Sequence, residues 1–285
     1  MSNISFVNGK YLNFKEAKIS INDRSIHFSD AVYEVIAVYD KKLVFWYEHL
    51  IRLKRSLSLM HINNFTFFET LKLKCNQIIE LNKLDEGLIY IQISRGSATR
   101  NHNWDKSLKP SLMISAIHKK VFFKIKTVSL ISHRDIRWDK CYIKSTSLLP
   151  NVLLKQKASD QKAFECVMYD YKGNITEATT SNVWIIKNKN IFTPPLNKNI
   201  LPGVTRKKVF EISKSLNISA EEKEINYKHL GKADGVFLTN SSSLLLTANK
   251  IDNINLGKDK NKISNLIFNE LLRIIRKNDV NKNRI

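Results

Sequence analysis

The chain changes character around residues 116–130, where the apolar strand-like segment AIH gives way to the charged segment KKVFFKIKTVSL. Its 285 residues are enough for one large domain or two modest ones. The hydrophobic share of 43% and the charged share of 26% are typical of a soluble globular protein. We therefore expect a small N-terminal domain over residues 1–120 and a larger C-terminal domain over residues 121–285.

Strand and helix patterns follow one another in the first half. The segment SFVNGKYL predicts a hairpin, because Asn8-Gly9 suits a two-residue turn. In GLIYIQISRG, the isoleucines Ile89, Ile91 and Ile93 alternate with polar or aromatic residues, which predicts a strand with one buried face. Two further strands are expected over residues 30–47, and amphipathic helices over residues 48–62 and 68–84.

The second half also mixes both kinds of element. Residues 163–195, AFECVMYDYKGNITEATTSNVWIIKNKNIFTPP, predict three strands joined by turns at residues 172–174 and 188–190. A helix over 202–216, a strand over 235–240 and a last helix over 263–277 follow. Without repeats or low-complexity tracts, the pattern indicates an α+β fold.

The formal net charge is +21, which is compatible with a nucleic-acid partner. The lysines are scattered, however, and no basic stripe with interleaved aromatics or known binding module is visible. A solvated basic surface explains the charge better, although a basic nucleic-acid-binding protein remains the non-enzyme alternative.

The sequence favours a cytoplasmic protein. No stretch reaches the roughly 18 apolar residues of a membrane span, and the first residues lack the pattern of a signal peptide. Cys75, Cys141 and Cys166 fit no zinc or disulfide spacing, which suits a reducing compartment. We expect no bound metal.

Lys144 stands out within CYIKSTSLLPNVLLKQKA, residues 141–158, because it ends a short apolar run. Burying an ammonium group is costly unless the group is paired or loses its charge. Lys144 is therefore a candidate for a chemical role.

Two segments could bind an anion. In LPGVTRKK, Pro202-Gly203 precedes a helix, so the N–H groups of Val204 and Thr205 would lie at its N-terminus. In LTNSSSLLL, Ser241 and its neighbours could supply further donors. Taken alone, the two segments are explained more simply as an ordinary helix start and a polar loop.

Glu177, in NITEATTSN, lies between an apolar strand and a hydroxyl-rich turn. A carboxylate there could pair with a protonated ring nitrogen, although a surface glutamate fits too. A lysine, a carboxylate and a phosphate site together are what pyridoxal phosphate requires of a protein.

From FVNGKYL to about residue 250 the chain resembles the class IV (fold type IV) pyridoxal-phosphate aminotransferases. That family includes D-amino acid and branched-chain aminotransferases and aminodeoxychorismate lyase. The resemblance implies two domains, with a small α/β N-terminal domain and a barrel-like sheet in the larger C-terminal one. It also implies a homodimer that binds pyridoxal 5'-phosphate.

The resemblance assigns roles to the motifs above. IKSTSLLPNVLLKQKA makes Lys144 the Schiff-base lysine and proton carrier, and TEATTSNVWII makes Glu177 the partner of the pyridine nitrogen. The remaining cofactor contacts implied by the family pattern are Arg52, Leu201, Val204, Thr205, Ser241 and Ser242. For Arg52, a helix-surface position is the simpler explanation without the resemblance.

The segment SATRNHNW is similar to the substrate-carboxylate trap of the D-amino acid aminotransferases. Arg100 and His102 are two apart in an extended loop, so they project to one side, and arginine can grip a carboxylate with two parallel hydrogen bonds. Tyr33 and Tyr90 match the two tyrosines that complete the substrate site. A polar surface loop and a packed strand aromatic remain alternatives.

The implied reaction is transamination between a D-amino acid such as D-alanine and a 2-oxo acid such as 2-oxoglutarate. It proceeds by a ping-pong mechanism through the pyridoxamine phosphate form of the cofactor. An L-branched-chain aminotransferase and an aminodeoxychorismate lyase of the same fold are the alternatives.

Overall fold

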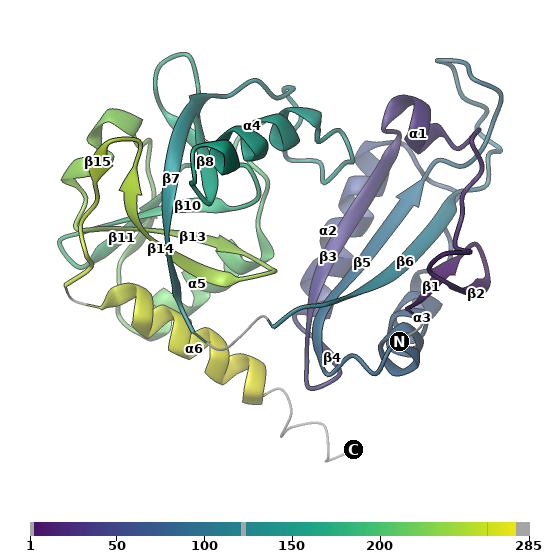
Figure 1. Ribbon diagram of the computed structural model, residues 1–285, viewed down its shortest axis with the longest axis horizontal. Helices are drawn as coiled ribbons and strands as arrows, with labels where there is room; N and C mark the ends of the chain where they lie inside the picture. Colours follow the sequence, from purple (N-terminus) through teal and green to yellow (C-terminus); the bar gives the residue numbers. More distant parts are fainter. Residues whose placement is uncertain (1–2, 121–123, 261, 278–285) are drawn as a thin grey trace. The chain divides into compact units, whose positions relative to one another are not determined.

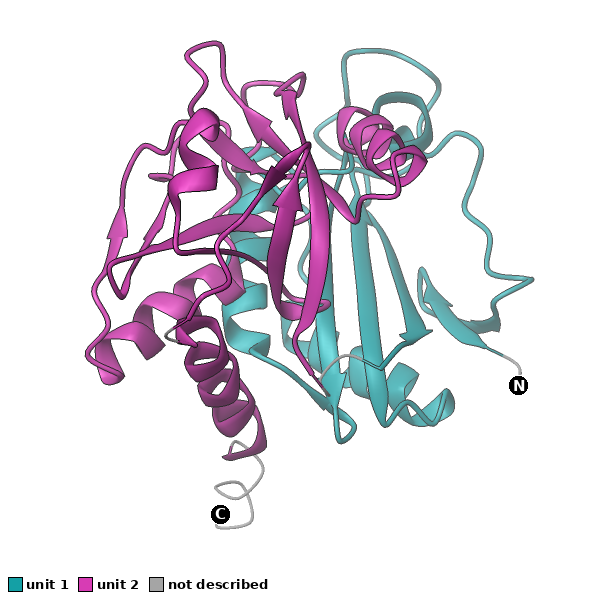
Figure 2. Ribbon diagram, turned by 60° about the vertical axis from the view of Figure 1, so that its left-hand side comes forward, with its two compact units in different colours: residues 1–121, 143–147 teal, residues 122–142, 148–285 magenta. Residues whose placement is uncertain are grey.

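The computed structural model describes residues 3–120, 124–260 and 262–277. The chain forms two compact units (Figure 2). Unit 1 consists of residues 1–121 and 143–147, and unit 2 of residues 122–142 and 148–285. The expected join over residues 116–130 includes residues 121–123, which lie outside the described residues.

Unit 1 is built on a six-stranded antiparallel sheet with strand order β2-β1-β6-β5-β3-β4 (Figure 1). Its elements are β1 (Ile4–Val7), β2 (Lys10–Asn13), α1 (Arg24–Phe28), β3 (Ala31–Tyr39), β4 (Lys42–Leu43), α2 (Trp46–Leu59), α3 (Phe68–Leu81), β5 (Glu86–Ser94) and β6 (Ser111–His118). The expected β1–β2 hairpin is confirmed, and both turn residues, Asn8 and Gly9, have positive φ.

The two faces of this sheet differ, as the sequence of β5 predicts. Ile89, Ile91 and Ile93 are fully buried, and Ile91 is the register partner of Glu34 in β3. Because side chains alternate between the faces of a strand, Tyr90 must stand on the opposite face. The helices α2 and α3 pack against β3, β1 and β6.

Unit 2 is built on a nine-stranded mixed sheet, in the order β12-β11-β10-β13-β14-β7-β8-β9 with β15 paired to β14. Its elements are β7 (Lys126–Arg134), α4 (Leu149–Asp160), β8 (Glu165–Tyr169), β9 (Ile175–Ala178), β10 (Asn182–Lys187), β11 (Asn190–Thr193), α5 (Val204–Ser215), β12 (Ala220–Glu222), the 3-10 helix η1 (Tyr227–Lys232), β13 (Gly235–Asn240), β14 (Leu244–Ile251), β15 (Ile254–Asn255) and α6 (Ile263–Lys277). The end strand β9 also contacts β10, so the sheet curls into a barrel-like form around an aliphatic core.

The segment over residues 163–195 contains four strands, so the prediction of three strands was wrong. The extra break lies at Thr179-Thr180-Ser181, between β9 and β10. Glu165, which is fully buried at the start of β8, accepts hydrogen bonds from the hydroxyls of all three turn residues and from the Thr180 amide. The hydroxyl-rich turn is therefore shaped by a buried carboxylate.

None of the helices in the described ranges is long and apolar enough to cross a membrane.

Glu165 is predicted to stabilise unit 2 through this turn. Replacing it with alanine leaves buried hydroxyls without an acceptor, which lowers the free energy of unfolding by about 2–4 kcal/mol. Glu165→Gln keeps the shape and one acceptor oxygen, so it lowers the free energy of unfolding by less. Urea unfolding followed by tryptophan fluorescence measures both.

Glu211→Ala is the matched control, because Glu211 pairs with Lys208 on the surface of α5, and such pairs contribute only about 0–1 kcal/mol. If Glu165→Ala unfolds at the same urea concentration as Glu211→Ala, the turn does not depend on the carboxylate.

Candidate active site

Lys144 lies in the short segment of unit 1 that docks on the first residues of β3. The Tyr33 amide donates to the Lys144 carbonyl at 3.0 Å, and the Thr146 amide donates to the Ala31 carbonyl, also at 3.0 Å. Between them, Ser145 forms an isolated bridge with Val32. The half-buried Lys144 side chain places its Nζ atom 4.1 Å from the centre of the Tyr33 ring. These main-chain bonds fix the backbone from which the Lys144 side chain reaches the Tyr33 ring.

Tyr33 and Tyr90 lie together on the sheet face opposite Ile89, Ile91 and Ile93. Their ring centres are 5.8 Å apart with an interplanar angle of 28°. The Tyr90 hydroxyl donates to Gln92 Oε1 at 2.6 Å. Burial, with a smaller contribution from Tyr33, raises the pKa of Tyr90 to about 12, so this phenol keeps its proton at neutral pH.

Arg52 is buried in α2 and is part of an ion-pair cluster. Its Nε and Nη2 atoms each donate to one oxygen of Glu34 at 2.8 Å, a bidentate pairing. His49 Nδ1 lies 2.7 Å from the same carboxylate. Burial alone would raise the pKa of Glu34, but Arg52 and His49 outweigh it and hold that pKa well below its usual range.

His49 is fully buried beside these charges. Burial lowers its pKa, and Glu34 opposes this effect, while the positive charges of Arg52 and Lys144 lower the pKa further. The cluster therefore brings Arg52 into the surroundings of Lys144 within unit 1.

Arg100 and His102 lie on the loop between β5 and β6, and both contact one aromatic ring. The Arg100 guanidinium carbon is 5.2 Å from the centre of the Phe28 ring, and the His102 ring centre is also 5.2 Å from it. Both side chains are exposed. Among the described residues of unit 1, no hydrogen bond, ion pair or ring contact links this pair to Tyr33 or Lys144.

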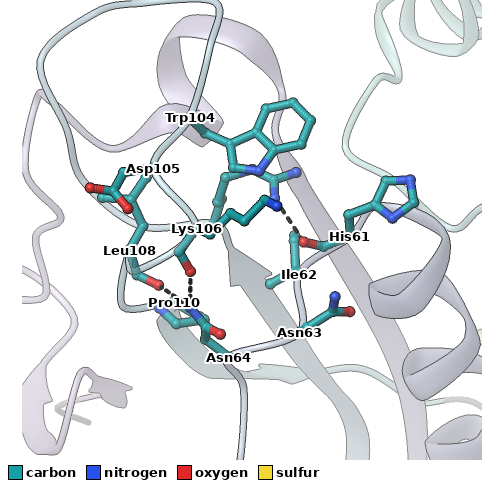
Figure 3. A pocket seen from close by; sticks show the side chains of 10 residues that line it. His61, Ile62, Asn63, Asn64, Trp104, Asp105, Lys106, Leu108 and Pro110 are labelled. Carbon is teal, nitrogen blue, oxygen red and sulfur yellow. Dashed lines mark hydrogen bonds between the residues drawn. The ribbon is translucent and has the colours of Figure 1, made fainter.

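A cavity of about 430 Å³ lies farther along the same loop and contains none of the predicted site residues. Figure 3 shows Trp104 and Lys106 on one side of it and His61 and Asn63 on the other. Asn64 closes its floor by donating to the carbonyls of Lys106 and Leu108.

Glu177 occupies β9 of unit 2 and is buried in a set of donors. One carboxylate oxygen accepts from Arg137 Nη1; the other accepts from Asn182 Nδ2 at 3.2 Å and from the Leu201 amide at 3.1 Å. Burial raises the pKa of Glu177, and Arg137 partly opposes this shift. Arg137 is held in turn by Asp135, through two of its guanidinium nitrogens.

The predicted phosphate loop lies directly beside Glu177. Leu201 is joined to it through its amide, and the Leu201 carbonyl accepts from Asn182 Nδ2 at 3.0 Å. Gly203 is the N-cap of α5 and offers no side chain to cap it. The first-turn residues Val204 and Thr205 are buried, and amides in a first helical turn have no intrahelical acceptor.

The hydroxyl turn after β13 lies next to the same end of β10. Asn182 is the register partner of Thr239, the penultimate residue of β13. Asn240 then shapes the turn, because its Oδ1 accepts from Ser242 Oγ at 3.1 Å and from the Ser243 amide at 2.7 Å. Ser241 lies in the same turn. Unit 2 therefore brings together Glu177, the start of α5 and this turn.

Comparison with known proteins agrees with this arrangement. The model of the amino-transferase class IV family matches residues 31–251. A D-alanine aminotransferase of Bacillus licheniformis is 35% identical over 253 residues, which cover 88% of this chain and 89% of the relative. The chain belongs to the class IV aminotransferases.

Solved structures confirm the expected two-domain α+β fold of type IV aminotransferases. A branched-chain aminotransferase from Thermoproteus uzoniensis, determined with norvaline, has a TM-score of 0.87 at 22% identity, covering 96% of this chain and 95% of that one. A Legionella pneumophila protein provisionally named a 4-amino-4-deoxychorismate lyase has a TM-score of 0.81 at 28% identity, covering 92% and 96%.

Family membership implies pyridoxal 5'-phosphate as the cofactor, and the residues of unit 2 fit it. Glu177 accepts three hydrogen bonds, whereas a carboxylate has about four acceptor positions. It can therefore accept another from a protonated ring nitrogen. The start of α5, which has no side-chain cap, suits a phosphate.

Four residues that support these groups escaped sequence analysis: Glu34, His49, Arg137 and Asn182. The first two had a detectable signal, namely a glutamate inside an apolar strand and a histidine three residues before Arg52 on a helix. Arg137 is 40 positions from Glu177 and had no such signal.

The Glu34 cluster predicts a pH-dependent stability. A carboxyl whose folded-state pKa is depressed contributes stability that is complete above its ordinary pKa of 4.5 and disappears as the pH falls through the depressed value. Glu34→Gln leaves Arg52 poorly paired, at a cost of about 3–5 kcal/mol near pH 7. In urea unfolding from pH 7 to pH 3, the difference in unfolding free energy between the wild type and Glu34→Gln should narrow steadily below about pH 4.5. A gap of equal size at pH 3 and pH 7 contradicts the ionic role of Glu34.

Gly203 is predicted to be required for cofactor binding. A Cβ atom at this position would lie 2.1 Å from Asn182 Oδ1, so Gly203→Ala must push Asn182 away from Glu177 and Leu201. We expect the affinity for pyridoxal phosphate to fall about tenfold or more, measured by absorbance titration of the apoprotein.

Gly231→Ala serves as the control, since its Cβ would meet only a methyl group of Ile254, at 2.7 Å. Equal affinities for the two variants would show that Asn182 does not shape the cofactor site.

Proposed function

We propose that this aminotransferase transfers the amino group of a D-amino acid such as D-alanine to a 2-oxo acid such as 2-oxoglutarate, in two half-reactions. The observation that carries this proposal is the Arg100 and His102 pair on the Phe28 ring, a ready site for one carboxylate. The 35% identity to a D-alanine aminotransferase supports the same substrate class.

Pyridoxal phosphate, when bound, supplies an electron sink that stabilises negative charge at the substrate α carbon. Lys144 would be the residue that joins the cofactor covalently, and its free amine would accept and return the proton of the substrate α carbon. Glu177 would hold the proton on the ring nitrogen, and Arg137 keeps Glu177 oriented through its ion pair.

The phosphate would be held by the amides of Val204 and Thr205, with Ser241, Ser242 and Arg52 as further donors. Leu201 would pack on the cofactor ring. Arg52 suits this role because Glu34 and His49 hold its guanidinium in one orientation. Ser242 donates its hydroxyl proton to Asn240, so it must rotate to reach an anion.

Arg100 and His102, with Tyr33 and Tyr90, would bind the substrate α-carboxylate. Tyr90 is a proton donor at neutral pH, as any ordinary tyrosine is, and burial raises its pKa further, to about 12. The side on which the carboxylate is held sets which enantiomer presents its α-hydrogen to Lys144. The expected form of the enzyme is a cytoplasmic homodimer.

Aminodeoxychorismate lyase is the second candidate, favoured by the 28% identity to the Legionella protein. That reaction would use the same Lys144 to eliminate pyruvate. Because the cofactor groups are shared, only the substrate separates the two functions.

The test is the visible absorption of the protein loaded with pyridoxal phosphate, followed in separate cuvettes with D-alanine and L-leucine. We expect D-alanine, and not L-leucine, to remove the visible absorption band of the bound cofactor, and 2-oxoglutarate to restore that band. Lys144→Ala should lower the steady-state rate by about a thousandfold or more, while the control variant Lys140→Ala, which removes an exposed lysine of unit 2, should react normally.

Conversion by L-leucine alone would assign the enzyme to the branched-chain group. No change with either amino acid, together with pyruvate release from 4-amino-4-deoxychorismate, would establish the lyase instead.

A further inference from the structure

Three successive carbonyls of the loop between β5 and β6 are bound by one buried guanidinium, that of Arg24. Nη1 donates to the Asn101 carbonyl at 2.6 Å and to the Asn103 carbonyl at 3.3 Å. Nη2 donates to the His102 carbonyl at 3.2 Å. Arg24 is only 4% exposed, although it is far from this loop in the sequence.

The Arg24 side chain is itself held rigidly. Its Nε atom donates to Asp30 Oδ2 at 2.8 Å, and its guanidinium carbon lies 4.7 Å from the centre of the Phe28 ring. Asp23, the N-cap of α1, accepts from the Ser25 amide and from Ser94 Oγ, which fixes the start of the helix. The guanidinium therefore has little freedom to follow the loop if the loop moves.

Asp30 is shared with a second buried arginine that serves a different part of the loop. Arg95 donates to both oxygens of Asp30, at 2.8 and 2.9 Å. It also donates to the carbonyls of Met60 and His61 and lies 4.1 Å from the Trp104 ring, beside the cavity of Figure 3. Arg95 contacts none of the three carbonyls that Arg24 binds.

The first residues of the loop are also tied to α1. The Arg24 amide donates to the Gly96 carbonyl at 2.9 Å, and the Ala98 amide donates to the Asn22 carbonyl at 3.1 Å. The Arg24 side chain holds the main chain farther along, at residues 101–103, within the stretch 99–103. That stretch includes Arg100 and His102.

The hydrogen bonds from Arg24 to the carbonyls of residues 101–103, here called the Arg24 clamp, explain why the exposed side chains of Arg100 and His102 both contact the Phe28 ring. With the carbonyls of residues 101–103 turned toward Arg24, Arg100 and His102 both reach Phe28, at 5.2 Å each. Phe28 belongs to the same short helix as Arg24. One helix thus holds the main chain of the pair and supports its side chains.

We propose that Arg24 is a positioning residue that sets the affinity of the enzyme for the substrate carboxylate by fixing the main chain of residues 101–103. The proposal rests on the proposed function, since it assigns Arg100 and His102 to the carboxylate. A preformed pair loses less freedom on binding than a mobile one. The effect therefore belongs to substrate binding and leaves cofactor binding unchanged.

Arg24→Lys is the informative variant, because lysine keeps the charge beside Asp30 but cannot span three carbonyls with one nitrogen. We expect KM for D-alanine to rise about tenfold or more, with kcat and the affinity for pyridoxal phosphate close to those of the wild type. Hydrogen exchange, measured by mass spectrometry, should quicken in residues 99–103.

Arg95→Lys is the matched control, since it disturbs the same Asp30 carboxylate without touching those carbonyls. We expect it to lower the melting temperature about as much as Arg24→Lys, with much smaller effects on KM and on exchange in residues 99–103. If Arg24→Lys does not fold, Phe28→Leu replaces it. Removing the ring should raise KM without quickening the exchange of residues 101–103.

An unchanged KM, or unchanged exchange, in Arg24→Lys overturns the proposal, and so does an equal rise of KM in Arg95→Lys. Failure of the proposed function is recognised separately, because the wild type would then not convert D-alanine. In that case the assignment to the carboxylate falls, while the exchange data still report whether Arg24 holds the loop.

Discussion

Buried arginines paired with carboxylates are the interaction on which the candidate site depends. Arg52 is paired with Glu34, Arg24 and Arg95 share Asp30, and all these side chains are less than 10% exposed. Removing such charges from water costs several kcal/mol per ion, so each pair is tolerated only with complete hydrogen bonding. The completeness of that bonding is what makes the surrounding main chain rigid.

The same principle operates in both units, around different groups of proposed site residues. In unit 2, Arg137 and Asn182 hold Glu177 and connect it to the start of α5 through Leu201. In unit 1, Glu34 orients Arg52, and Arg24 orients the loop that carries Arg100 and His102. In each case a residue with no direct role in chemistry is the one that fixes the reacting or binding group.

The sequence predicted whatever depends on neighbouring residues. Alternation in β5 and the Asn8-Gly9 turn are local patterns, and both were confirmed. The break at residues 179–181 was missed because the group that shapes it, Glu165, lies about 15 positions earlier and acts through its buried carboxylate. The Arg24 clamp was missed for the same reason, since it acts across 77 positions. Long-range hydrogen bonds leave no periodicity that a sequence can display.

The two groups of proposed site residues are anchored in different ways, which explains how one fold can serve different substrates. The residues of unit 2 that we propose hold the cofactor are joined to strands of its barrel-like sheet, so altering them would disturb the core as well as the proposed chemistry. The pair proposed to bind the substrate carboxylate, Arg100 and His102, lies instead on a loop anchored by Arg24 of α1 and by Asp30, outside the strands themselves. A few substitutions there could change which carboxylate is held, and on which side, without loss of the fold. The high structural similarity to a branched-chain aminotransferase, despite low sequence identity, is what such an arrangement allows.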